Sequence, residues 1–262
     1  GSGSLTDLTT GADNTGVGRL SLADLTTGSH NTAIGCESLD ALSTGDHNTG
    51  LGKAALGSIT TASDNTAVGS GAAGSTTGSN NTAVGRSSLN ANTTGERNTA
   101  VGTRSLENQT TGTLNTAYGY ESGQANNATG ITAIGYKALE ANTTANYNTA
   151  VGYEALKNNT TGGVNGPNVA VGKYALLANT TGDNNVAISA LGSNTTGSDN
   201  TGVGANALGS NTTASHNTGV GKGALGVNIT GQFNTAVGSL ALDANTTGSQ
   251  LTAIGYQSLS AN

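Results

Sequence analysis

The stretch Asn98-Thr99-Ala100-Val101-Gly102, followed by Leu106 and by Thr110-Thr111-Gly112, decides the fold because its pattern returns along the whole chain. The next unit opens 17 residues later with Asn115-Thr116-Ala117-Tyr118-Gly119. A fixed period this short is typical of a solenoid, in which each unit stacks only on its neighbours. We number the positions of each unit from its first Asn, so that Asn98 occupies position 1.

Apolar anchors recur at positions 4 and 9, as in Val101 and Leu106, and a glycine such as Gly102 stands between them at position 5. Two anchors on either side of a glycine bend favour two short strands per coil. Seventeen residues are too few for a strand, a crossover helix and a second strand, and the density of Gly, Asn and Thr disfavours helix. The sequence therefore predicts an all-β fold, a parallel β-solenoid (β-roll) of about fifteen 17-residue coils with two short strands per coil.

The composition limits both the interior and the partners of the chain. With 42 Gly, one Phe, no Trp and no Met, the 262 residues leave mainly Val, Ile, Leu and Ala to fill a core, which predicts a thin interior. The net charge of −6 and the lack of a basic run argue against a nucleic-acid partner. Apolar runs stay far below the ~18–20 residues that span a bilayer, so no membrane insertion is expected in this segment.

The repeat pattern also defines the expected domain. Residues 1–4 (Gly-Ser-Gly-Ser) resemble an expression linker, and residues 5–262 are predicted to form a single β-solenoid repeat domain, a fragment of a longer protein because neither end carries an atypical capping unit. Two coils depart from the register. Residues 163–168 (Gly-Val-Asn-Gly-Pro-Asn) carry about three extra residues and the only proline, which predicts a bulging loop, and residues 186–191 (Val-Ala-Ile-Ser-Ala-Leu) lack the glycine bend and two residues, which predicts a tightened turn.

Position 12 changes character along the chain, from Leu25 and Leu42 near the start to Asn142, Asn159 and Asn179 further on. A position that accepts either leucine or asparagine is expected to face inward, where stacked amides can hydrogen-bond from coil to coil. The sequence therefore predicts an asparagine ladder inside the solenoid.

Position 3 is always Ala or Gly. Because alternate residues of a strand point to opposite faces, an inward Val at position 4 predicts an outward position 3, and a file of small residues there predicts a flat companion surface. The expected partner is a second copy of the chain, in a homo-oligomer or an end-to-end filament. The predicted self-association face comprises Gly16, Ala33, Gly50, Ala67, Ala83, Ala100, Ala117, Ala133, Ala150, Ala170, Ala187, Gly202, Gly219, Ala236 and Ala253.

The sequence predicts no catalytic residues, no cofactor and no metal site, since it contains no paired carboxylates, no nucleophile with a base and no conventional ligand set. His30 and His47 share position 17 beside Asp46; a metal pair is one interpretation, and polar residues on a variable turn are the favoured one. Tyr120, Tyr136 and Tyr153 at position 6 predict an aromatic strip. Mutual stacking is its favoured role, and a sugar or a cation is its possible ligand.

The units Asn98-Thr99-Ala100-Val101-Gly102 and Leu251-Thr252-Ala253-Ile254-Gly255 resemble the Ser-Val-Ala-Ile-Gly repeats of trimeric autotransporter adhesin heads, and similar repeats occur in phage tail fibres. The resemblance covers essentially the whole chain and about five positions per unit. It implies a left-handed β-roll, three copies about one axis, and an extracellular location on a cell surface or virion.

These observations favour a non-enzymatic structural or adhesive fibre segment that meets a host surface or a carbohydrate. An ice-binding (antifreeze) β-solenoid that uses Thr ladders at positions 2, 13 and 14 is the alternative. A β-helix acting on polysaccharide is disfavoured because no acid and base cluster is present.

Overall fold

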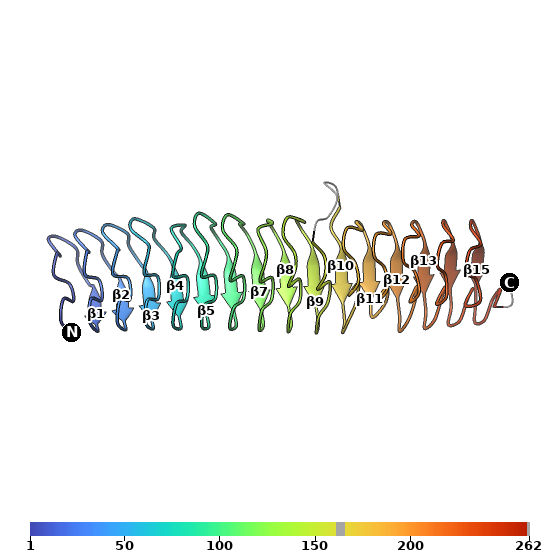
Figure 1. Cartoon of the computed structure of the whole chain (residues 1–262), viewed down its shortest axis with the longest axis horizontal. Coiled ribbons are helices and arrows are strands. Elements are labelled where there is room, and N and C mark those ends of the chain that lie inside the picture. The colour runs from blue at the N-terminus through green and yellow to red at the C-terminus, as the bar shows by residue number, and fades with distance from the viewer. Residues whose placement is uncertain (161–165, 261–262) are drawn as a thin grey trace. The chain divides into compact units, whose positions relative to one another are not determined.

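The computed structural model describes residues 1–160 and 166–260, so the loop predicted at 163–168 lies partly outside the described residues. The chain divides into two compact units, Gly1–Gly130 and Ile131–Asn262. Each unit is a β-solenoid of parallel three-residue strands that lie side by side in chain order (Figure 1). The strands of the first unit are β1 (Thr15–Val17), β2 (Thr32–Ile34), β3 (Thr49–Leu51), β4 (Thr66–Val68), β5 (Thr82–Val84), β6 (Thr99–Val101) and β7 (Thr116–Tyr118). Those of the second unit are β8 (Thr132–Ile134), β9 (Thr149–Val151), β10 (Val169–Val171), β11 (Val186–Ile188), β12 (Thr201–Val203), β13 (Thr218–Val220), β14 (Thr235–Val237) and β15 (Thr252–Ile254).

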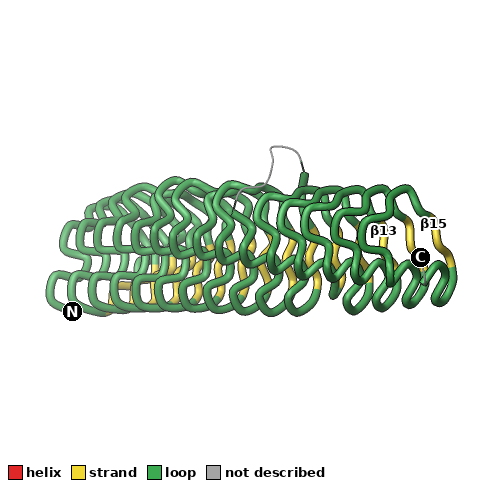
Figure 2. The backbone as a smooth tube through the Cα atoms, turned by 45° about the vertical axis from the view of Figure 1, so that its right-hand side comes forward, coloured by secondary structure: helices red, strands yellow, loops and turns green. Residues whose placement is uncertain are grey.

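Equal positions of successive coils pair with one another. In β6 and β7, Thr99 pairs with Thr116 and Ala100 with Ala117, and the same register holds along both units. The predicted all-β solenoid is thereby confirmed. Among the described residues no helix occurs (Figure 2), and none is therefore long and apolar enough to cross a membrane.

The second strand predicted for each coil is absent from the described residues. The Leu at position 9 sits in a turn with a left-handed backbone, as in Leu106 (φ 47°) and Leu156 (φ 51°). The coils still hydrogen-bond there, because the Leu106 N–H donates to the Ser122 carbonyl at 3.0 Å. A ladder of stacked turns thus replaces the expected second sheet.

The predicted orientation of the strands is wrong. The Ala and Gly residues at position 3 lie inside the coil: Ala33, Ala67, Ala83, Ala100, Ala117, Ala133, Ala150, Ala170, Ala187, Ala236 and Ala253 are buried, as are Gly50, Gly202 and Gly219, and Gly16 is partly buried. These side chains are covered by their own chain, so they cannot form the predicted self-association face.

Lack of interior space explains why position 3 stays small. A Cβ added at Gly50 would come 2.5 Å from Ser38 Oγ and 3.2 Å from Leu39 Cγ, both from the facing turn of the preceding coil. The Leu at position 9 fills the interior instead. It is fully buried in all the coils between the two ends of the chain that carry it, namely in Leu22, Leu39, Leu56, Leu89, Leu106, Leu139, Leu156, Leu176, Leu191, Leu208, Leu225 and Leu242, and Leu259 of the last coil is 48% exposed.

Two ladders of buried amides line the interior. The predicted ladder at position 12 is confirmed, since Asn159 Nδ2 donates to Asn142 Oδ1 at 3.0 Å and Asn179 Nδ2 donates to Asn159 Oδ1 at 2.9 Å. A second ladder at position 1 was not predicted. There, Asn48 Oδ1 accepts both the backbone N–H and the Nδ2 of Asn65, at 3.1 and 3.2 Å.

The glycine at position 5 is required by both conformation and space. Gly102 has φ 129°, which disfavours residues with a Cβ, and a Cβ there would collide with the Gly119 carbonyl of the next coil. Residues 1–4, predicted as a linker, continue the coil: the Leu20 N–H donates to the Ser2 carbonyl at 3.0 Å, and Ser4 Oγ lies 2.9 Å from Ser21 Oγ.

Candidate interaction surface

The strands present two files of side chains outward, because the inward residue at position 3 turns positions 2 and 4 toward solvent. We call these two files the outer strand face. Its apolar file at position 4 runs through Val17, Ile34, Leu51, Val68, Val84, Val101 and Tyr118 in the first unit, and through Ile134, Val151, Val171, Ile188, Val203, Val220, Val237 and Ile254 in the second. Position 2 is Thr throughout, except for Val169 and Val186.

The apolar file remains accessible in the single chain. Val17 is 54% exposed, Ile34 40% and Ile188 43%, and the other members are partly buried or exposed. Within the strands, backbone N–H and C=O groups bond the neighbouring coils, so this face offers side chains and not an open strand edge. Contiguous exposed apolar residues of this kind mark interaction sites.

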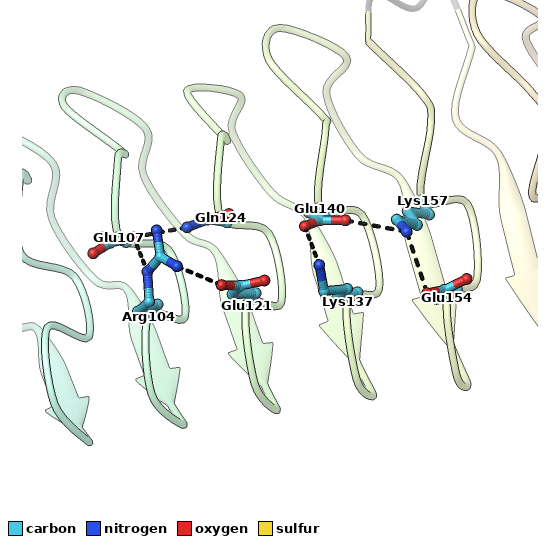
Figure 3. Close-up of polar contacts among 8 residues, drawn as sticks. All are labelled: Arg104, Glu107, Glu121, Gln124, Lys137, Glu140, Glu154 and Lys157. Carbon is cyan, nitrogen blue, oxygen red and sulfur yellow. Dashed lines mark hydrogen bonds and ion pairs between the residues drawn. The ribbon is translucent and has the colours of Figure 1, made fainter.

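Charged residues lie on the bends beside this face, in compact clusters (Figure 3). In the first unit, Arg104 Nε contacts Glu107 Oε2 and Arg104 Nη1 contacts Glu121 Oε1, each at 2.6 Å. The hydrogen bond to Glu107 is the main cause that raises the pKa of Arg104. In the second unit, Lys157 Nζ lies 3.2 Å from Glu154 Oε1 and 3.5 Å from Glu140 Oε2.

Within the second unit, two of the predicted tyrosines stack and a third ring joins them. Tyr136 and Tyr153 stack with ring centroids 5.0 Å apart and planes 11° apart. Tyr174, which stands at position 7 and was not predicted, meets Tyr153 edge-on at 5.6 Å. Tyr120, in the other unit, is 42% exposed. The sequence signal that was missed is the run Lys173-Tyr174, in which the ring is displaced by one position.

The two histidines stack as turn residues. His30 and His47 lie with ring centroids 5.0 Å apart, and Asp13 Oδ2 lies 3.7 Å from His30 Nδ1. No group of three or more metal-ligating side chains occurs among the described residues. In the second compact unit, His216 and Phe233, which both stand at position 17 of their coils, stack in the same way with ring centroids 4.7 Å apart. Rings at this position therefore stack from coil to coil in both compact units.

Comparison with known proteins found no match: no family description, curated protein or solved structure is similar to this chain.

Proposed function

We propose that this chain is a non-enzymatic structural or adhesive fibre segment, extracellular on a cell surface or virion, which associates with copies of itself through the outer strand face. The observation that carries the proposal is the apolar file at position 4, which repeats in register with the coils and stays accessible in the single chain. The resemblance of the repeats to adhesin heads supports the surface location and favours a trimer.

Self-association follows from the regularity of this face. A file with one apolar side chain per coil, about 4.8 Å apart, can align with the same file of another copy over many coils. Each pair of coils then buries apolar area, at about 25 cal/mol per Å², while the charged clusters lie on the bends and keep their ion pairs within the chain. A closed ring of copies satisfies all the files at once.

The mass of the chain in solution tests this proposal. Light scattering coupled to size exclusion should give a multiple of the 25.4 kDa chain mass, with a trimer expected. The double variant Val203→Glu and Val220→Glu places a carboxylate on the face in two adjacent coils and should yield monomers. The matched control is Val227→Glu, at position 11, where Val227 is 41% exposed away from the face. The proposal is wrong if the wild type is a monomer, or if the double variant and the Val227→Glu control have the same mass in solution.

Ice binding is the second candidate, and one observation favours it. The Thr of position 2 lies beside the apolar file on the outer strand face, so hydroxyl and methyl groups alternate on a regular sheet. The Thr of position 13 is used internally, since Thr26 Oγ1 donates to the Ser43 carbonyl and Thr195 Oγ1 to the Thr212 carbonyl, both at 3.0 Å. Thermal hysteresis of the wild type, lost in the Val203→Glu and Val220→Glu variant, would support this candidate. Ordinary freezing at high protein concentration would end it.

A further inference from the structure

The coil of residues 185–199 lacks positions 6 and 7, and the ladder around it shows which residues are missing. The Ser189 N–H donates to the Val171 carbonyl at 2.8 Å, as position 5 does in other coils. The Leu191 N–H donates to the Ala207 carbonyl at 3.1 Å, as position 9 does elsewhere. Ser189 is therefore position 5, Leu191 is position 9, and the bend between them is absent.

The missing bend leaves a notch between the bends of the two flanking coils. Its cavity of about 220 Å³ is lined by Lys173 and Tyr174 on one side, by residues 189–193 at its floor, and by Asn206 and Gly209 on the other side. Drug-sized ligands occupy pockets of about 300–1,000 Å³, so the notch matches a ligand of about one sugar ring.

The notch also interrupts the backbone ladder. In full-length coils the position 7 N–H donates to the position 6 carbonyl of the preceding coil, as Tyr174 does to Tyr153 and Gly223 to Ala205, both at 3.0 Å. Of the described residues, none supplies this donor to the Lys173 carbonyl or this acceptor to the Asn206 N–H. One wall of the notch thus presents a backbone acceptor, and the other presents a backbone donor.

Side chains add an apolar platform and a charge. Tyr174 is 40% exposed, and its ring is held edge-on by Tyr153. Lys173 Nζ lies 4.6 Å from the centre of the Tyr174 ring, and within the described chain it forms no ion pair. Ser189, Ser193 and Asn206 supply further polar groups at the lining.

We infer that this notch binds an acidic saccharide, with a carboxylate-bearing pyranose as the bound residue. The apolar C–H face of such a ring packs on Tyr174, its carboxylate pairs with the Lys173 ammonium, and its hydroxyls both donate to the Lys173 carbonyl and accept from the Asn206 N–H. A purely apolar ligand would leave these backbone groups unsatisfied at a cost. The inference rests on the adhesive part of the proposed function and gives it a ligand class.

Ligand-observed NMR titration with methyl β-glucuronide, and with methyl β-glucoside as its uncharged analogue, tests the inference. The full chain should bind the glucuronide in the millimolar range and the glucoside at least about tenfold more weakly. Lys173→Ala should remove this preference, and Tyr174→Ala should abolish binding of both sugars. The matched control Lys222→Ala, at position 6 of a full-length coil, should bind as the wild type does.

A gain-of-length variant completes the test. Ser189→Gly combined with insertion of Ser-Gly between residues 189 and 190 copies the native Gly69-Ser70-Gly71 bend, restores the full coil and should abolish glucuronide binding while the fold is kept, with Ser189→Gly alone as its control. Binding that survives this insertion, equal binding of both sugars, or full competition by inorganic phosphate would overturn the inference. Oligomer mass is measured separately, so a chain that trimerises but ignores glucuronide fails this inference alone.

Discussion

Replacement of Asn48 by alanine tests whether the unpredicted amide ladder at position 1 holds the coils together. Asn48 is fully buried. Its Nδ2 donates to the Ala62 carbonyl at 2.9 Å, and its Oδ1 accepts from the backbone N–H of Asn65 at 3.1 Å. In the coil that begins at Asn48, position 12 is Ile59 and not Asn, so no second amide is present there to replace either hydrogen bond. Asn48→Ala therefore leaves one buried backbone acceptor and one buried backbone donor without these partners, whereas Asn65 Nδ2, which also donates to Asn48 Oδ1, keeps its bond to the Ser63 carbonyl at 3.2 Å.

The magnitude follows from these two groups. Each buried polar group that loses its partner costs about 1–3 kcal/mol, so Asn48→Ala should lower the free energy of unfolding by about 2–6 kcal/mol. This loss is a large share of the ~5–15 kcal/mol typical of a native protein. At about 2–4 °C per kcal/mol for a large domain, the melting temperature should fall by roughly 10 °C.

Urea unfolding followed by circular dichroism measures the loss, and hydrogen exchange of the Asn65 amide locates it. The matched control is Asn108→Ala, an exposed asparagine of the same unit at position 11, which should stay within about 0.5 kcal/mol of the wild type. If Asn48→Ala is as stable as Asn108→Ala, or if the Asn65 amide keeps its protection, the ladder is not a main source of stability and the reasoning fails.

Three further outcomes follow from the interior and the bends. Ala100→Leu should overpack the thin interior and cost about 1–3 kcal/mol in urea unfolding, because Ala100 is fully buried. Gly102→Ala should destabilise the chain by at least about 1–3 kcal/mol through its φ of 129° and a clash with Gly119, whereas Gly57→Ala, where a Cβ would meet nothing closer than 3.4 Å, should be nearly neutral. Burial raises the pKa of Asp40, whose Oδ1 has no hydrogen-bond partner. Since its folded-state pKa then exceeds its unfolded-state pKa, protonation favours the fold, and Asp40→Asn should raise the urea midpoint at pH 7 but not at about pH 3, below the ordinary value of ~3.9.

Sequence periodicity predicted the solenoid, its parallel stacking and the amide ladder of position 12, because each depends only on the same residue returning at the same place. It could not predict which face of the strand is inside. Alternation defines two faces, and hydrophobicity alone would bury Val101 before Ala100. The depth of the interior decides the matter, since Leu106 and its equivalents already fill it.

A usable signal was nevertheless present in the sizes of the residues. Position 3 never exceeds Ala, whereas position 4 accepts Val17, Leu51 and Tyr118. A position that tolerates this range of volumes faces open space, and one that tolerates only a methyl group faces a packed interior. The prediction of a second strand was wrong for another reason. Leu at φ near 50° is costly in isolation, so the sequence of one coil does not indicate it, and hydrogen bonds between the stacked turns stabilise it.

The corrected orientation determines where recognition can reside. Methyl groups, leucines and paired amides occupy the interior, so substitution there costs stability, while the exposed side chains of the outer strand face can change without unpacking the interior. The outer strand face repeats once per coil, so it suits contact with an equally regular surface. When one coil is aligned with its partner coil, the neighbouring coils are aligned as well. A discrete ligand requires the opposite, a local break in the period, and the coil that lost its bend between Ser189 and Ala190 supplies one beside Tyr174. Self-association and ligand capture can therefore evolve on the same coil without competing for the same residues.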